Sequence, residues 1–156
     1  MEMAAQERLG LHLKRVEQEL MAAKGAALRP LGLTVPQYVA LFMLAEHQGI
    51  SAAGLARACL VTPQTIATVL TNLESKALIT RRPHPWHRRI AEIALTEDGQ
   101  SLLARADAEA VRIERELADG YTPQEREQLI ELLARASGQL TQLHSLSAPT
   151  VSTPVT

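Results

Sequence analysis

Aromatic residues and cysteine are both scarce in this chain. Aromatic side chains make up only 3% of the 156 residues, although hydrophobic residues make up 46%. The core must therefore be built mainly from Leu, Ala, Val and Ile, a mixture that favours packed helices over a large sheet. The one cysteine, Cys59, cannot form an intrachain disulfide, and there is no Cys-x-x-Cys pair for a structural metal. We expect one folding unit, either one compact domain or a small domain with helical extensions, without a metal or a cofactor.

Long apolar runs are missing too. The longest, Val39 to Ala45, is far too short to cross a bilayer. Charged residues interrupt the segment from Met1 to Leu20, which therefore does not read as a secretion signal. We expect a soluble, cytoplasmic protein without a membrane partner.

Four sequence motifs that are typical of enzyme active sites are absent. It contains no Gly-rich phosphate loop, no His-Glu-x-x-His, no Ser-x-x-Lys and no Gly-x-Ser-x-Gly. The pair His84 and His87 has the spacing of two metal ligands but no third ligand beside it. The chain is therefore not expected to be an enzyme.

The net charge of −1 hides an uneven distribution along the chain. Residues 51 to 96 contain six basic and two acidic residues, a net charge of +4, whereas five basic and ten acidic residues follow from position 97 onward. A local excess of cations favours contact with phosphates, because binding releases the counterions condensed on DNA. A solvated basic face is an equally good interpretation of charge alone.

Hydrophobic spacing predicts helices in the first third of the chain. Leu9, Leu13, Val16 and Leu20 follow one another at intervals of four, three and four, which predicts a helix from about Ala4 to Leu28. We expect it to stop at Arg29-Pro30, since a residue before proline avoids the helical region. A second helix should begin at the N-cap Thr34 and stop at Gly49.

Two further capping signals follow closely. Ser51 should cap a short helix through Leu55 to Cys59, and Thr62-Pro63 should open a fourth helix that continues to about Lys76. Two helices separated by three or four residues, the second opened by a capping Thr, have the spacing of a helix-turn-helix.

The next segment predicts a β-hairpin. Strand-like residues at Leu78–Arg82 and Arg88–Leu95 flank the turn-rich Pro83–His87, which gives the helix-turn-helix a wing.

Two helices should complete the chain. Thr96 should cap a helix that ends at Gly120 and carries an apolar stripe suited to packing on another long helix: Leu103, Ala106, Ala110, Ile113 and Leu117. Thr122-Pro123-Gln124-Glu125 is a capping box for a last helix through Leu143. The Ser, Thr and Pro residues from Ser145 onward predict disorder.

The order and spacing of these elements resemble the MarR family of winged-helix regulators. The matching residues are Leu33-Thr34, Gln37, Leu41, Leu44-Ala45-Glu46, Leu55-Ala56, Pro63-Gln64-Thr65-Ile66, Leu73 to Ile79, Arg81-Arg82, Arg88-Arg89 and Leu95 to Gly99. The resemblance implies a mainly α fold with a small β-hairpin wing. It divides the chain into an N-terminal dimerisation helix (1–32), a winged helix-turn-helix lobe (33–96), C-terminal dimerisation helices (97–144) and a tail (145–156).

The resemblance also implies a function. It indicates a homodimeric transcription regulator, a repressor on a pseudo-palindromic operator in double-stranded DNA, released by a small aromatic or phenolic effector. The fourth helix would enter the major groove and the wing the minor groove. The residues expected at DNA are Thr62, Pro63, Gln64, Thr65, Thr68 and Asn72 on the helix and Arg81, Arg82, Arg88 and Arg89 on the wing.

This chain departs from the family pattern at three places. Thr68 and Asn72 stand where a cation is usual, His84 and His87 stand where the wing often has Asp, and Leu60 replaces a small residue of the turn. Much of the affinity for DNA would then fall on the four arginines. The alternative is a winged-helix protein-interaction module that has lost DNA binding.

Other residues receive a role only through the resemblance. His12, Arg15 and Tyr38 are candidates for the effector pocket, with ordinary surface or core roles as the alternative. Cys59 falls at a position that the family fills with core Leu, so we expect a buried, inert thiol. Trp86 at the wing tip would pack on its own hairpin or on a sugar of the minor groove.

Overall fold

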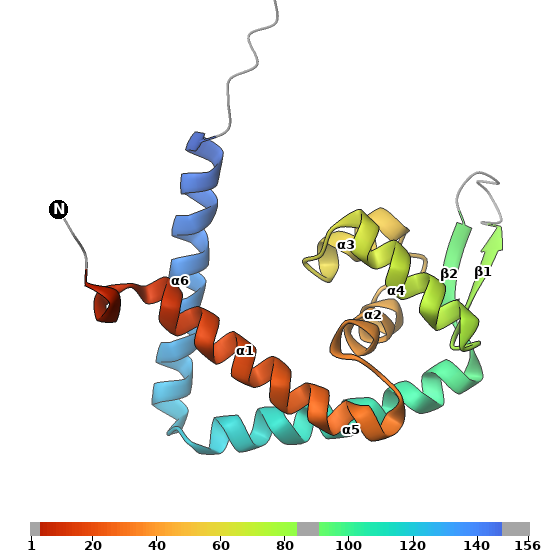
Figure 1. Ribbon diagram of the computed structural model, residues 1–156, viewed down its shortest axis with the longest axis horizontal. Coiled ribbons are helices and arrows are strands. Elements are labelled where there is room, and N and C mark those ends of the chain that lie inside the picture. Colours follow the sequence, from red (N-terminus) through yellow and green to blue (C-terminus); the bar gives the residue numbers. More distant parts are fainter. Residues whose placement is uncertain (1–3, 84–90, 148–156) are drawn as a thin grey trace, which may run out of the picture. The chain divides into compact units, whose positions relative to one another are not determined.

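A computed structural model describes residues 4–83 and 91–147 of the chain. Six α-helices, two short 3-10 turns and a two-stranded sheet make up this part, in agreement with the fold class predicted from the sequence (Figure 1). In chain order the elements are η1 (Ala5–Glu7), α1 (Leu9–Leu28), η2 (Arg29–Leu31), α2 (Val35–Glu46), α3 (Ala52–Ala58), α4 (Pro63–Ser75), β1 (Ile79–Pro83), β2 (Ala91–Leu95), α5 (Glu97–Asp119) and α6 (Pro123–Ser147).

The chain forms two compact units, Met1–Glu114 and Arg115–Thr156. The core of the first unit consists of aliphatic side chains, as the scarcity of aromatic residues requires. Its largest fully buried side chains come from the end of α1 and from α2, α3 and α4: Leu28, Leu41, Leu55, Leu70 and Leu73. This core fixes the place of α4 relative to the helices behind it.

The first helix differs from its prediction at both ends. It begins at Leu9 rather than near Ala4, because Arg8 has an extended conformation and its side chain makes no capping hydrogen bond. It ends at Leu28 as predicted, but Arg29 is helical, with φ −55° and ψ −44°. The proposed reason for the stop was therefore wrong: the chain tightens into η2, and Gly32 at φ 69° then turns it away.

The predicted N-caps of α2, α3 and α4 are confirmed. The backbone N–H groups of Gln37, Gly54 and Thr65 donate to the hydroxyls of Thr34, Ser51 and Thr62, over 3.4, 3.1 and 3.2 Å. At Thr34 the bond is reciprocal, because its own N–H donates to Gln37 Oε1 over 3.1 Å. Local sequence therefore determines where the helices of this lobe begin.

The two strands form an antiparallel hairpin, with Ile79 opposite Leu95 and Arg81 opposite Ile93. Pro83, predicted to lie in the hairpin tip, is instead the last residue of β1 and pairs with Ala91. A proline is acceptable at the end of a strand in a two-stranded sheet, where few ladder bonds are lost. The remaining tip residues His84, Pro85, Trp86 and His87, and the predicted strand residues Arg88 and Arg89, lie outside the described residues.

The start of α5 is fastened to the residues that precede β1. Thr96 caps the helix as predicted, since its hydroxyl accepts from Gly99 N over 3.0 Å. The same hydroxyl donates to Ala77 O over 2.7 Å, and Thr96 N donates to Leu78 O over 3.1 Å. A β-carbon on Gly99 would lie 2.0 Å from Leu78 O, so glycine is required for this approach.

The apolar stripe of α5 is divided between two environments. Leu103, Ala106 and Ala110 are 8%, 0% and 2% exposed and belong to the core of the first unit. The single chain therefore already buries this part of the stripe. Leu117, further along, remains 43% exposed.

The last helix begins as predicted. Thr122 and Glu125 form the reciprocal capping box, with Thr122 N donating to Glu125 Oε2 over 2.8 Å and Glu125 N donating to Thr122 Oγ1 over 3.3 Å. These bonds hold the pKa of the Glu125 carboxyl below its ordinary value. The helix continues to Ser147, so Ser145 to Ser147 are helical and not part of a disordered tail; residues 148–156 lie outside the described part.

In the described ranges no single helix is both long and apolar enough to cross a membrane. Two pairs of consecutive helices reach that length only together, and they bend by 81° and 108° at their junctions.

Candidate nucleic-acid interface

The turn between α3 and α4 is short and contains an unusual leucine. Leu60 has φ 55°, in the left-handed region, and its side chain is 92% exposed. That conformation costs a residue other than glycine roughly 1 kcal/mol. On either side of it, Cys59 N donates to Leu55 O over 2.8 Å and Val61 N donates to Ala56 O over 3.0 Å. These bonds cap the carboxyl end of α3 and direct the chain toward α4, as in a helix-turn-helix.

The fourth helix has one buried and one exposed face. Ile66, Val69, Leu70 and Leu73 point into the core, at the spacing of one helix face. The other face carries small and polar side chains, all exposed: Gln64, Thr65, Ala67, Thr68, Thr71, Asn72 and Ser75. Of the six residues predicted to contact DNA from this helix, four therefore share the exposed face, and the other two, Thr62 and Pro63, open the helix.

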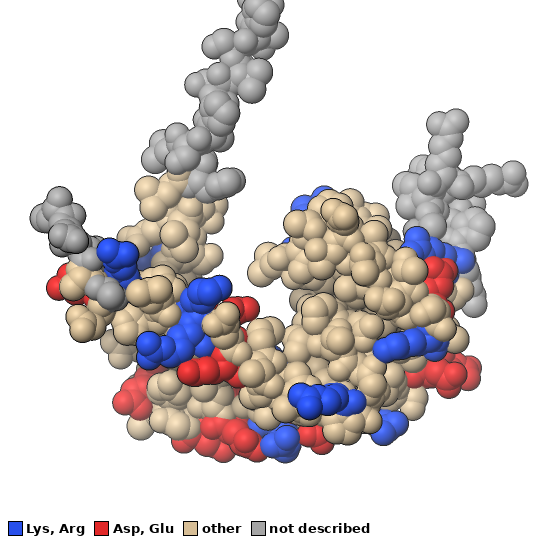
Figure 2. Space-filling model, viewed as in Figure 1, with Lys and Arg blue, Asp and Glu red and all other residues tan. Residues whose placement is uncertain are grey.

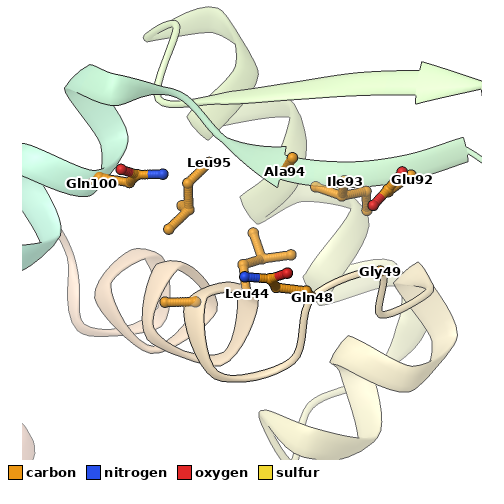
Figure 3. A pocket seen from close by; sticks show the side chains of 9 residues that line it. Leu44, Gln48, Gly49, Glu92, Ile93, Ala94, Leu95 and Gln100 are labelled. Carbon is orange, nitrogen blue, oxygen red and sulfur yellow. The ribbon is translucent and has the colours of Figure 1, made fainter.

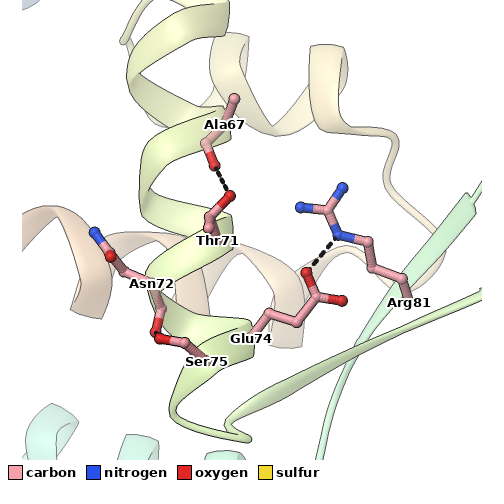
Figure 4. A network of polar contacts seen from close by, with 6 residues as sticks. All are labelled: Ala67, Thr71, Asn72, Glu74, Ser75 and Arg81. Carbon is pink, nitrogen blue, oxygen red and sulfur yellow. Dashed lines mark hydrogen bonds and ion pairs between the residues drawn. The ribbon is translucent and has the colours of Figure 1, made fainter.

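Most hydroxyls of this face already donate hydrogen bonds within the helix. Thr68 donates to Gln64 O over 3.2 Å. Thr71 donates to Ala67 O over 3.0 Å and Ser75 to Asn72 O over 2.8 Å (Figure 4). Their oxygens remain acceptors and the threonine methyls remain apolar contacts. The amide side chains of Gln64 and Asn72 are then the readiest donors on this face.

A depression of about 450 Å³ adjoins the same face. It is bounded by the first turn of α2, with Thr34 and Gln37, and by Gln64, Thr68 and Asn72 of α4. Lys76, just after α4, reaches across to this region, because Nζ donates to Gly32 O over 2.7 Å and to Gln37 Oε1 over 3.3 Å. The lysine ties the end of α4 to the start of α2.

Charge at this interface comes from the neighbouring strand. The only charged residue in α4 is Glu74, and its Oε2 lies 3.1 Å from Nε of Arg81 on β1 (Figure 4). Arg82 lies opposite Glu92 in the register of the hairpin. Arg88 and Arg89, predicted at DNA, fall outside the described residues.

Acidic side chains gather elsewhere. On the face seen in Figure 2 the Asp and Glu side chains lie mainly along α5, whereas the surface formed by α2, α3 and α4 is mostly uncharged.

The three candidate effector residues are not brought together. The Tyr38 hydroxyl donates to Asp107 Oδ1 over 2.8 Å, and burial together with this bond raises the pKa of Tyr38 well above its ordinary value. His12 Nε2 lies 3.0 Å from Gln6 O, and Arg15 is exposed on α1. Tyr38 is buried in the core of the first unit, at 8% exposed.

A cavity of about 400 Å³ lies instead between α1, the start of α2 and the helix-turn-helix. Its lining is mainly apolar, with Met21, Val39 and Ile66 among its walls. Lys24, which forms an ion pair with Glu114, lines it as well. Cys59 is half-buried at its edge rather than fully buried, and burial raises the pKa of its thiol, which keeps it protonated.

A second cavity, of about 280 Å³, lies between the end of α2 and β2. Leu44, Ile93 and Leu95 form its apolar wall, while Gln48, Glu92 and Gln100 supply polar groups (Figure 3). It borders the wing strand and not the exposed face of α4. No group of three or more His, Cys, Asp or Glu side chains that could hold a metal ion occurs among the described residues.

Comparison with known proteins agrees with this geometry. A model of the MarR family matches residues 31–90. Over 120 residues the chain is 42% identical to the HTH-type transcriptional repressor Rv2887 of Mycobacterium tuberculosis, a match that covers 76% of this chain and 86% of that protein. The chain belongs to the MarR family.

Solved structures of MarR proteins share the fold. BpsR of Bordetella bronchiseptica, whose DNA binding is regulated by 6-hydroxynicotinic acid, is 26% identical, with a TM-score of 0.80 over 88% of this chain and 98% of that chain. The repressor CouR of Rhodococcus jostii, bound to a 23-mer DNA duplex, is 27% identical, with a TM-score of 0.78 over 88% and 99%. Rv2887 in complex with salicylic acid has a TM-score of 0.69 and 34% identity over 86% and 99%.

Sequence reasoning missed the residues that complete this face. Ser75 and the Glu74–Arg81 ion pair were not among the expected contacts. Ser75 could have been found by extending the helical period from Thr68 and Asn72. The ion pair could not, because it depends on how β1 returns along α4.

Proposed function

We propose that this MarR protein is a cytoplasmic, homodimeric transcription repressor that binds a pseudo-palindromic operator in duplex DNA, without a catalytic step. The observation that carries the proposal is the exposed polar face of α4. The N-cap fixes the start of this helix, and its opposite, apolar face packs into the core. A helix presented in this way fits the major groove, which admits one α-helix. The family's repressors and the CouR complex with duplex DNA support it.

The side chains of α4 suit A·T base pairs. Glutamine and asparagine amides recognise adenine through N6 and N7, and threonine methyls fit against the thymine methyl group. Gln64 and Asn72 supply the amides, and the hydroxyl bonds of Thr68 and Thr71 to the helix backbone favour presentation of their methyls. We propose half-sites in which A·T pairs face this helix, with Arg81, Arg82, Arg88 and Arg89 supplying contacts to phosphate or to the minor groove.

Exposed apolar residues support the homodimer. In the single chain Leu9 and Val16 on α1 are 73% and 55% exposed, and Leu132 and Leu140 on α6 are 44% and 60% exposed. Apolar surface of this extent is typical of an interface between subunits. The two helices would form the dimer interface, as the family resemblance implies.

The 400 Å³ cavity supports release by a small aromatic or phenolic acid. Its apolar walls fit a ring, and Lys24 can meet a carboxylate or phenolate. Such a ligand would compete with Glu114 for that lysine. Complexes of relatives with salicylic acid and with p-coumaroyl-CoA set the class of ligand, and His12, Arg15 and Tyr38 remain the residues proposed from the sequence.

A gel-shift titration with the DNA upstream of the protein's own reading frame tests the proposal. We expect specific binding with a Kd of about 10 nM or tighter at physiological salt, and a preference of at least a thousandfold over scrambled DNA of the same composition. Salicylate should weaken the complex.

The alternative is a winged-helix module that binds another protein and not DNA. The absence of any cation in α4 favours it. Equal, weak binding to the upstream and the scrambled DNA would support this alternative and overturn the repressor.

A further inference from the structure

The exposed face of α4 lacks a cation of its own, and the neighbouring strand places one beside it. From Pro63 to Ser75 the helix contains neither Lys nor Arg. Arg81 on β1 lies next to the last turns of α4, with Nε 3.1 Å from Oε2 of Glu74. The two side chains are 39% and 45% exposed, so the pair sits at the surface and not in the core.

The ion pair leaves the outer edge of the guanidinium available. A guanidinium has five N–H donors, and the atom of Arg81 that lies against Glu74 is Nε, which carries only one of them. The two Nη groups lie beyond that bond, on the side of Thr71 (Figure 4). Across residues 4–83 and 91–147 no other acceptor holds them. A second anion can therefore bind Arg81 without displacing Glu74.

We propose that Glu74 is a positioning residue that holds Arg81 against α4 as a clamp for a DNA phosphate. This inference rests on the proposed DNA binding and deepens it. The position near the carboxyl end of α4 favours a phosphate over a base, because the first residues of a reading helix reach deepest into the groove. The phosphate would belong to the strand that passes between α4 and the wing.

Two effects of Glu74 oppose each other. Its carboxylate repels a nearby phosphate, but the repulsion is reduced because Arg81 is paired with it and the pair is half exposed. Against this, an arginine already held in one orientation loses less side-chain freedom when the phosphate arrives. We expect the gain from orienting Arg81 to outweigh the repulsion between Glu74 and the phosphate. The direction in which the affinity for DNA changes when Glu74 is removed therefore tests the proposal.

A double-mutant cycle on the full-length protein measures that sign. Binding of Glu74→Ala, Arg81→Ala and the double variant to the upstream DNA is measured across a range of salt concentrations. Arg81→Ala should weaken binding about tenfold and lower the salt slope by about one per chain. Glu74→Ala should weaken binding about threefold in the parent, despite the loss of a negative charge, and should have no such effect once Arg81 is absent.

Two controls separate positioning from other roles. Glu74→Gln, which keeps an acceptor for Nε, should restore the affinity, whereas Glu46→Ala removes an exposed carboxylate of α2 and should not weaken binding. Circular dichroism and thermal unfolding show whether each variant folds.

Tighter binding of Glu74→Ala in the parent would mean that Glu74 sequesters Arg81, and would overturn the inference. An unchanged salt slope in Arg81→Ala would overturn it as well. If the parent itself shows no preference for the upstream DNA, the proposed function fails before the cycle begins, so the two failures are distinguishable.

Discussion

Gly99 in the first turn of α5 lies in close backbone contact with Leu78. Its Cα lies so near the Leu78 carbonyl that a β-carbon would be 2.0 Å from the oxygen. No flexible side chain can move aside, since the obstacle is backbone. The contact joins α5 to the residue before β1, and any larger residue must separate the two.

Gly99→Ala should therefore lower the free energy of unfolding by about 3 kcal/mol or more. The matched control is Gly138→Ala in α6, where a β-carbon meets nothing within 4 Å. That change should be neutral or raise the free energy of unfolding by up to about 1 kcal/mol, through helix propensity. Urea denaturation of both variants measures the difference; equal stabilities would show that α5 can shift away at little cost.

Residue-scale features were predictable from the sequence where the interaction is local. Each N-cap hydroxyl accepts from the backbone N–H three residues later, so a short segment of sequence is enough to predict it. This holds for Thr34, Ser51, Thr62 and Thr96. The Glu74–Arg81 pair depends on the path of the chain between helix and strand. No local rule gives that path.

At the scale of elements, a partly buried hydrogen bond joins α2 to α5. Tyr38 on α2 is 8% exposed, and its hydroxyl donates to Asp107 on α5 over 2.8 Å. Burial and the nearby carboxylates raise the pKa of this phenol above the ordinary value of 10.0. The neutral phenol is thus the form that the folded protein stabilises.

This shift predicts a loss of stability in alkali. Below pH 10 both the folded and the unfolded states keep the Tyr38 proton, so the contribution is fully present. Above pH 10 the unfolded state loses it first, and stability should fall by up to about 1.4 kcal/mol per pH unit. Tyr38→Phe should be about 1 kcal/mol less stable at pH 7 but should lose less between pH 10 and 11.

Tyr121→Phe is the control for this titration, because that tyrosine is 42% exposed. Denaturation at a series of pH values compares the three proteins. A Tyr38→Phe variant as sensitive to alkali as the parent would show that other groups cause the loss.

The ends of elements were harder to predict than their existence. All six helices and the hairpin lie where hydrophobic spacing and caps place them, but α1 starts later and α6 ends later than expected. The stripe of α5 shows the limit more clearly. Spacing identifies an apolar face, yet it does not tell whether Leu103 and Ala106 meet their own lobe or a second chain.

At the scale of the whole molecule, the proposed dimer depends on leucines that the single chain leaves exposed. Leu117 and Leu129 are 43% and 40% exposed. Replacing both with Asp should place charges in the interface and give monomers or unfolded protein, as measured by sedimentation. Leu60→Asp, at a leucine that is 92% exposed in the turn, should leave the sedimentation of the parent unchanged. A dimer that survives the double change would place the interface elsewhere.

The hydrogen bonds at the start of α5 couple this helix to the hairpin. Its start is joined through Thr96 to the chain that enters β1, so we expect the helix and the hairpin to move together. Lys24 of α1 forms an ion pair with Glu114, further along α5. Glu114 lies fifteen residues from Gly99, which is about 22 Å along the axis of an α-helix. A ligand that binds in the 400 Å³ cavity and draws Lys24 away from Glu114 would therefore act on the wing through α5, without contacting the wing itself.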